Sequence, residues 1–254
     1  MSNLNDLIEQ AAALVKKARY MVALTGAGIS TPSGIPDFRS PDSGVWERTD
    51  PLAVASIYAF RQSPQRFYNW IHPLSHLLLQ AEPNPAHYAL VTLETEGKLR
   101  AIITQNIDDL HGKAGSQSIH ELHGNLKEAT CIECFEIKAA GGIFEKFVED
   151  GRVPTCHCGG VLKPNVILFG EQLPIREYLA AEMAIKKADL VLVAGSSLEV
   201  SPAADLPGLA LDNGARLIIV NYQPTHLDAR ADVVIHADVA DVLPRLVEAV
   251  RVTE

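Results

Sequence analysis

The sequence predicts an α/β fold built on a doubly wound, mostly parallel β-sheet. Short apolar runs, of the kind found in strands that are buried on both faces, recur along the chain. Segments with the apolar spacing of helices lie between or after these runs. Two further stretches interrupt the alternation, which predicts two insertions into the sheet.

The predicted strands are short and strongly apolar. The first is Tyr20-Met21-Val22-Ala23-Leu24, which leads directly into a glycine-rich stretch. Later runs of the same character occupy 101–103, 189–194, 216–220 and 233–236. Because strands of this kind alternate with helices, we expect them to pair in parallel with helices on both faces of the sheet.

The predicted helices follow from apolar residues at helical spacing. They cover 4–18, 85–97, 176–188 and 239–252. In the helix over 176–188 we expect Leu179, Met183, Ala184 and Ala188 to share one face.

The two interrupting stretches differ in composition. Residues 31–83 are rich in proline, glycine and aromatic residues and include short helical pieces such as Pro64 to His72, whereas the second stretch carries all four cysteines. We therefore expect a single domain over 1–254 with a sheet-forming core over 1–40, 84–124 and 164–254, a helical insertion over 41–83 and a metal-binding module over 125–163.

Composition and charge exclude several classes of protein. The formal net charge of −9 argues against electrostatic binding to nucleic acid or to an anionic membrane surface. No apolar run reaches the length that spans a bilayer, and the first ten residues lack the basic and apolar regions of a secretory signal. We expect a cytoplasmic protein without membrane or direct nucleic-acid partners. No seam for self-association is evident, so we expect a monomer.

A glycine-rich loop follows the first strand. Gly26 and Gly28 allow a tight turn in which backbone N–H groups approach a pyrophosphate, although an ordinary strand-to-loop turn explains the same pair. The continuation from Ile29 to Arg39 is punctuated by prolines and glycine and predicts a flap rather than an immediate helix. In that flap, Phe38 could shield a reactive centre from water and Arg39 could reach phosphate.

Polar residues follow the run 101–103. Asn106 and Asp108 lie where wound sheets bind ligands, and together they could grip a carboxamide; helix capping is the alternative interpretation. Further along, His123 is a candidate general base because the pKa of histidine lies near neutrality. His111 and His120 are interpreted as incidental, since the chain holds nine histidines.

The cysteines form two close pairs, C-x-x-C at Cys131 and Cys134 and C-x-C at Cys156 and Cys158. Two such pairs predict a closed, structural four-cysteine zinc site, which would help a small module to fold. His157 could replace one thiolate. A redox dithiol is a further alternative, but the C-x-x-C pair does not begin a helix.

These motifs together resemble the sirtuin family. The resemblance rests on 26–30 with 34–39, on Thr104-Gln105-Asn106-Ile107-Asp108, on Leu122-His123-Gly124, on the cysteine pairs, and on Phe169-Gly170-Glu171, 195–200 and Asn221. The motifs occur in family order from about residue 7 to 250, as in a minimal, prokaryote-like member. The C-x-C spacing departs from the commonest pattern. The resemblance implies a Rossmann-like sheet with a small zinc-ribbon module and a helical insertion.

The resemblance also implies a function, that of an NAD-dependent protein-lysine deacetylase that yields lysine, nicotinamide and O-acyl-ADP-ribose. It implies catalytic roles for His123, as general base, Asn106 and Asp108. The residues implied for NAD are Gly26, Ala27, Gly28, Ser30, Ile35, Asp37, Phe38, Arg39, Gln105, Asn106, Ile107, Asp108, Gly195, Ser196, Ser197, Asn221 and Ala240. Those implied for the acyl-lysine substrate are Val166, Phe169, Gly170, Glu171, Glu199 and Val200, and those for zinc are Cys131, Cys134, Cys156 and Cys158.

Acyl preference follows from a helix alignment. Family members that favour acidic acyl groups place a tyrosine and an arginine in the acyl pocket, and Ile71 and Leu74 occupy those places here. Burying an unpaired carboxylate against apolar side chains is costly, so we expect acetyl or longer neutral acyl groups. Two other functions remain open, an NAD-dependent ADP-ribosyltransferase and a non-catalytic NAD sensor.

Overall fold

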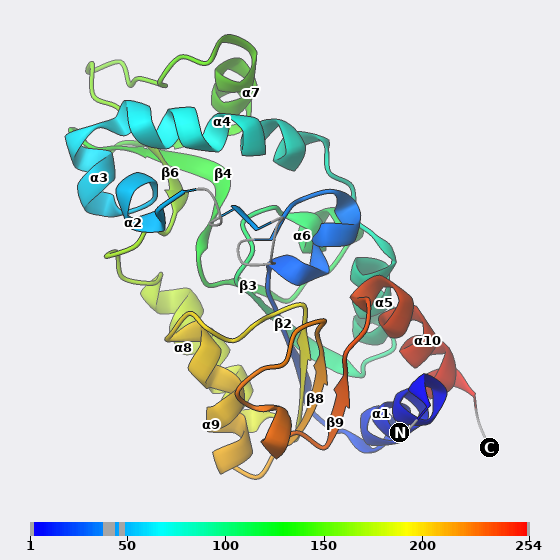
Figure 1. Ribbon diagram of the computed structural model, residues 1–254. Coiled ribbons are helices and arrows are strands. Elements are labelled where there is room, and N and C mark those ends of the chain that lie inside the picture. The colour runs from blue at the N-terminus through cyan, green and yellow to red at the C-terminus, as the bar shows by residue number, and fades with distance from the viewer. Residues whose placement is uncertain (1–2, 38–43, 46–48, 253–254) are drawn as a thin grey trace.

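A computed structural model describes residues 3–37, 44–45 and 49–252 of the chain. Its larger part is a parallel six-stranded sheet in the order β3-β2-β1-β7-β8-β9 (Figure 1). The strands are β1 (Met21–Thr25), β2 (Leu99–Thr104), β3 (Ile119–Glu121), β7 (Leu190–Ala194), β8 (Arg216–Val220) and β9 (Val233–Ile235). The strand order reverses between β1 and β7, and doubly wound sheets bind ligands at such a reversal. The predicted fold class is confirmed.

The central strands are buried on both faces, which explains their unbroken apolar sequences. Every residue of β1 and β7 is buried. Successive side chains of a strand point to opposite faces, and along β1 they enter two separate apolar clusters. Met21 and Ala23 belong to one cluster, and Val22 and Leu24 belong to the other.

Helices cover both faces of this sheet. One face packs against α1 (Leu4–Lys17), α5 (Pro85–Thr95) and α10 (Val239–Arg251) (Figure 1). The other packs against α8 (Ile175–Lys187) and α9 (Leu206–Asp212). A short helix, α6 (Leu110–Ala114), follows the loop after β2. The helix predicted over 85–97 ends at Thr95, and Gly97 lies in the left-handed region with φ 72°.

The predicted face of α8 is wrong. Ala184 and Ala188 are buried against the sheet, with 6% and 7% of their surface exposed. Leu179 and Met183 are 49% and 57% exposed instead. At about 100° per residue, Leu179 projects roughly 140° away from Ala184. The small side chains let α8 approach the sheet closely, so the larger apolar residues lie on the opposite side of the helix.

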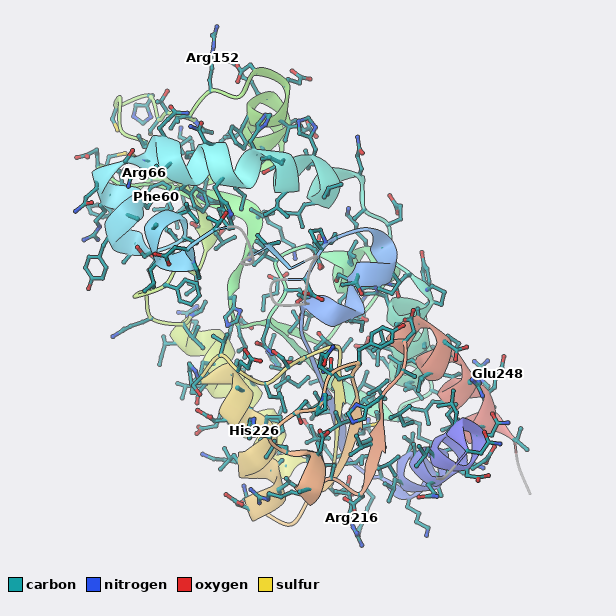
Figure 2. All side chains as sticks on the ribbon, viewed as in Figure 1. Phe60, Arg66, Arg152, Arg216, His226 and Glu248 are labelled. Atoms are coloured by element: carbon teal, nitrogen blue, oxygen red, sulfur yellow. The ribbon has the colours of Figure 1, made fainter. Side chains whose placement is uncertain are left out.

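A second, smaller layer lies beyond the carboxyl edge of the large sheet. It is an antiparallel sheet in the order β5-β4-β6, formed by β4 (Gly124–Cys131), β5 (Ile137–Ala139) and β6 (Leu162–Val166). Around it lie α2 (Pro51–Val54), α3 (Ile57–Gln62), α4 (Pro64–Gln80) and α7 (Gly141–Asp150) (Figure 1). In Figure 2, Arg152 beyond this layer and Arg216 on the large sheet extend from opposite ends of the molecule.

The helix α4 is longer than the sequence predicts. The short helical piece expected to end at His72 continues to Gln80 with Pro73 inside it. Proline removes one helical hydrogen bond. The hydroxyl of Ser75 donates to the carbonyl of Ile71 at 3.0 Å across this point. Buried contacts of Ile71, Ser75 and Leu78 hold the second half of the helix in place.

An aromatic cluster joins the helices to the small sheet. The rings of Phe60 and Phe67 lie 5.3 Å apart, and those of Tyr68 and Phe147 lie 4.9 Å apart. The Tyr68 hydroxyl donates to the carbonyl of Leu162 on β6. The small layer is therefore one packed unit that carries one wall of the site. Within the described part of the chain, no helix has the length and apolarity needed to cross a membrane.

Candidate active site

A cavity of about 810 Å³ lies between the two layers. Its lower wall in Figure 1 comes from the loops that follow β1, β2, β7 and β8. Its upper wall comes from α4 and from the segment that follows β6. The cavity thus lies at the strand-order reversal, where the sequence placed the ligand site.

The glycine-rich loop packs closely against the loop after β7. The Gly28 N–H donates to the Gly195 carbonyl at 2.8 Å. Gly195 has φ +64°, and a Cβ there would lie 2.2 Å from the backbone nitrogen of Ile29. Only glycine satisfies both conditions. Short 3-10 turns at Ala27–Ile29 and Thr31–Ser33 follow β1 in place of an α-helix, and Ala27, Gly28 and Ser30 line the cavity.

A buried polar network links the loops after β1 and β2. The Ser30 hydroxyl donates to Asp108 Oδ2 at 2.6 Å, and the Asn106 amide donates to Ser30 Oγ at 3.0 Å and to the Gly26 carbonyl at 3.1 Å. Asp108 also accepts from the Leu110 N–H at 2.9 Å. Asp108 therefore both supports α6 and lines the cavity. Burial raises the pKa of this carboxyl, and its hydrogen bonds oppose the shift.

His111, which the sequence analysis interpreted as incidental, supports this network through Thr25 and Thr104. Its Nε2 lies 2.9 Å from Thr25 Oγ1, which donates to Thr104 Oγ1 at 2.9 Å. Thr104 Oγ1 in turn accepts from the Asn106 N–H at 3.1 Å. Burial lowers the pKa of His111 to about 3, so the ring is neutral at physiological pH. Sequence reasoning missed this role, although the position of His111 three residues after Asp108, in the same motif, was a signal that could have revealed it.

His123 lies in the turn between β3 and β4 and lines the cavity. Its Nδ1 is 2.9 Å from the Gln105 carbonyl. A carbonyl oxygen only accepts, so Nδ1 carries the proton and Nε2 is the basic nitrogen. Gly124 beside it has φ +74°, and a Cβ there would lie 1.9 Å from the Asn165 carbonyl oxygen. Glycine therefore lets β6 approach and places the histidine.

Two further predicted residues, Ser196 and Asn221, lie in the loops after β7 and β8 and form hydrogen bonds there. The Gln105 amide donates to Ser196 Oγ at 2.9 Å, and the Asn221 amide donates to the Gln223 carbonyl at 2.7 Å. Ala240 does not line the cavity; its N–H donates to Asp238 Oδ1 at 2.8 Å, while Val239 lines the cavity.

Phe38 and Arg39 lie outside the described residues, although Asp37 lines the cavity. The remaining residues predicted for NAD all line it: Gly26, Ala27, Gly28, Ser30, Ile35, Gln105, Asn106, Ile107, Asp108, Gly195, Ser196, Ser197 and Asn221. The sequence analysis missed further lining residues at the β8 end, namely Tyr222, Gln223, Pro224, Ala237 and Val239.

The residues predicted for the substrate all line the cavity, with Glu199 and Val200 in the loop after β7 and the others in the opposite wall: Val166, Phe169, Gly170 and Glu171. The segment after β6 is held by a partly buried ion pair that the sequence analysis missed. Lys163 Nζ lies 2.9 Å from Glu171 Oε2 and donates to the Val166 carbonyl at 2.8 Å. Glu171 Oε2 also accepts from the Leu168 N–H at 2.8 Å. One lysine therefore ties both ends of the segment to β6.

The apolar part of the cavity comes from α4. Ile71 and Leu74 line it as the helix alignment requires. Phe67, Trp70 and Leu78 line it too. The sequence analysis missed these three, although their spacing along one helix face could have revealed them.

The four cysteine sulfurs lie within 4.8 Å of one another. Cys131 and Cys158 are 3.5 Å apart, and Cys134 and Cys156 are 3.8 Å apart. Zinc–sulfur bonds of about 2.3 Å in a tetrahedron place sulfurs about 3.8 Å apart, so the set fits a structural zinc. His157 pairs with Glu136 at 3.0 Å beside this cluster.

Fold and cavity together define a Rossmann-like α/β protein with a ligand site at the switch point of its sheet and a cysteine-rich module on the opposite wall. A family model described as "Sir2 family" matches residues 26–202. The chain belongs to the Sir2 family.

Relatives of nearly the same length support this assignment. The chain is 45% identical to NAD-dependent protein deacylase 2 of Archaeoglobus fulgidus over 98% of both chains. It is 46% identical to NAD-dependent protein deacetylase 1 of Geobacillus kaustophilus over 86% of this chain and 88% of that one. The solved structure of Sir2Af2 bound to a myristoylated histone peptide superimposes with a TM-score of 0.85, at 40% identity over 97% of each chain.

Proposed function

We propose that this chain is an NAD-dependent protein-lysine deacylase. It would convert acyl-lysine, NAD and water into lysine, nicotinamide and O-acyl-ADP-ribose. The observation that carries the proposal is that His123, Asn106 and Asp108 meet in one cavity beside an apolar wall. The Archaeoglobus relative is named a deacylase and the Geobacillus relative a deacetylase, and one solved Sir2 structure is described as holding a p53 peptide and NAD⁺.

The cavity offers groups for each part of NAD. We place the phosphates beside the backbone at Ala27 and Gly28 and the Ser196 hydroxyl, all of which line the cavity. Asn106 and Asp108 suit the nicotinamide carboxamide, with Ile35 packing beside it. We place Asn221 at the adenosine ribose, and we assign Phe38 and Arg39 of the flap to shielding and phosphate contact. NAD supplies the ADP-ribose that accepts the acyl group as nicotinamide leaves.

His123 acts as the general base in this proposal. The Gln105 carbonyl fixes its tautomer, which leaves Nε2 to accept a proton from a ribose hydroxyl. The hydrogen-bonded network of Ser30, Asn106 and Asp108 fixes these side chains in the cavity, and fixed polar groups of this kind suit electrostatic stabilisation of the reaction. Zinc on the four cysteines has no open coordination position and serves the structure alone.

The acyl-lysine would enter between the segment after β6 and Glu199–Ser201. Phe169 already exchanges backbone hydrogen bonds with Ala55 and Ile57, at 2.9 and 3.0 Å. We propose that the substrate backbone pairs with these segments as an added strand. The apolar side chains of α4 favour acetyl and longer neutral acyl groups, because a succinyl carboxylate would lose its hydration there without a cationic partner. Comparable turnover of acetyl and succinyl forms of one peptide would contradict this preference.

The proposal also covers domain organisation, partners, oligomeric state and location. We propose a single catalytic domain over 1–254, in which the core, the helical insertion 41–83 and the zinc module 125–163 act together. The net charge of −9 supports a protein without direct nucleic-acid partners. We propose that it acts as a monomer in the cytoplasm.

The deciding experiment is mass spectrometry of an acetyl-lysine peptide incubated with the protein, with and without NAD, alongside His123→Ala. Loss of about 42 Da that requires both NAD and His123 supports the deacylase. Label transferred from NAD onto protein would favour an ADP-ribosyltransferase. NAD binding without turnover of any acyl peptide would favour a sensor.

A further inference from the structure

The helix α8 is apolar on two opposite sides. Its core side packs Ala181, Ala184 and Ile185 against the sheet. Its outer side carries Ile175, Leu179 and Met183, which are 67%, 49% and 57% exposed.

The outer residues form a continuous stripe. They are spaced four apart, so they fall within about 80° of the helix circumference and extend for about 12 Å. The stripe faces roughly away from the core side, so packing of the sheet gives no reason for its composition. An ion pair between Glu182 and Lys186, at 3.1 Å, borders it. Exposed apolar side chains grouped on a surface are a common feature of interaction sites.

The stripe is continuous with the proposed substrate cleft. Ile175 at its first turn lines the same cavity as His123 and Phe169. Figure 1 shows α8 starting beside the loop that descends from β6 and running along the outside of the large sheet. A polypeptide held between the loops of the cleft would therefore pass directly onto this helix.

The small size of the stripe and its position on a helix indicate which kind of partner it binds. A lasting dimer needs about 20–30 residues on each side, and three side chains over 12 Å are too few. A strand cannot pair here because a helix offers no free backbone edge, whereas a second helix can pack its apolar face on the stripe. We propose that the α8 stripe, Ile175-Leu179-Met183, binds an amphipathic helical segment that adjoins the acylated lysine in protein substrates. This inference rests on the deacylase activity proposed above and adds a second contact to it.

The test compares a five-residue acetyl-lysine peptide with the same peptide extended, on either side, by about 20 residues that form an amphipathic helix. One extension carries leucines on its apolar face, and the matched extension carries serines at those positions. In the unmodified protein, we expect the leucine extension on one side of the lysine to give a KM about 10-fold lower than its serine counterpart. The double variant Leu179→Glu/Met183→Glu should abolish this difference. It should leave turnover of the short peptide unchanged, because neither residue lines the cavity.

Tyr88→Glu is the control, since Tyr88 is 51% exposed on α5 and lies outside the cavity. It should retain the full difference between the extensions. Equal KM values for the leucine and serine extensions in the unmodified protein would overturn the inference. So would a dimer, in sedimentation equilibrium, that the double variant dissociates, because a second copy would then cover the stripe. Failure to deacylate even the short peptide would instead show that the deacylase activity itself is wrong.

Discussion

The two sheets face each other across one cavity but are stabilised differently. In the six-stranded sheet, β1 and β7 are buried along their whole length between two apolar clusters. In the three-stranded sheet, burial along β6 alternates from residue to residue, so one face packs on a single aromatic cluster. The large sheet can rely on apolar burial alone. The small sheet is covered by apolar side chains on one face only, so we expect it to need the cysteine cluster for stability as well.

This difference has a consequence for the site. β4 begins at Gly124, beside His123, and ends at Cys131 in the cysteine cluster. β6 continues directly into the segment that we propose holds the substrate, and this segment lines the cavity. The NAD-binding wall should therefore form independently of zinc, whereas the substrate wall should depend on it.

Removal of zinc should have the largest effect. Because zinc binding supplies folding free energy to the small layer, chelation or Cys134→Ser should lower deacylase activity by more than about 100-fold. NAD affinity, measured by calorimetry, should change less than about twofold. Activity should return when zinc is added back after chelation. An equal loss of NAD affinity would show that the two walls are not independent.

Loss of the Asp108 carboxylate should affect the NAD side alone. Asp108→Asn keeps the shape but weakens the bond from the Ser30 hydroxyl, so kcat/KM for NAD should fall about 10- to 100-fold. The peptide KM, measured at saturating NAD, should stay constant. Glu177→Gln, at a surface pair with His120, is the matched control. A rise in peptide KM with unchanged NAD kinetics would contradict the assignment.

Loss of the Lys163 ammonium should affect the substrate side alone. Lys163→Met leaves the Glu171 carboxylate without its cationic partner, so the segment 166–171 should loosen and the peptide KM should rise about 10-fold. The KM for NAD should not change. Lys163→Arg, which keeps the charge, should recover part of the loss. If NAD and peptide KM rise together, the ion pair supports the whole fold rather than one wall.

The last prediction concerns stability and pH. Burial lowers the pKa of His87 to about 4 from its ordinary 6.5, so the unfolded chain binds a proton more readily than the folded one. Stability should be complete above pH 6.5 and fall with decreasing pH, by about 2 kcal/mol at pH 5 from this residue. Urea unfolding of His87→Asn should show a shallower loss between pH 7 and pH 5.

His226→Asn, at the exposed histidine labelled in Figure 2, is the control for that measurement and should keep the original slope. An unchanged slope in His87→Asn would mean that the unfavourable protonation lies elsewhere, with His111 as the next residue to test. The rings of these two histidines lie 4.9 Å apart.

Much of the fold could be predicted because it depends on local composition. The runs that became β1 and β7 are apolar without interruption because both faces are covered, and the spacing of the cysteine pairs predicts their chemistry. Where the prediction was wrong, the deciding contacts were tertiary. The sequence of α8 offers two apolar sides of similar strength, and only the fit of Ala184 and Ala188 against the sheet selects one.

The sequence by itself determined the class of fold, and it predicted the four-cysteine cluster and most of the residues that line the cavity at the strand ends. Periodicity and short motifs encode these features within a few residues of one another. Only the tertiary structure decided that His111 supports the network and that Lys163 ties down the substrate segment. Thr25, the partner of His111, lies 86 positions before it in the sequence, whereas Glu171, the partner of Lys163, lies in the segment just after β6. Neither contact leaves a periodic trace in the chain, because each depends on how the folded segments are placed.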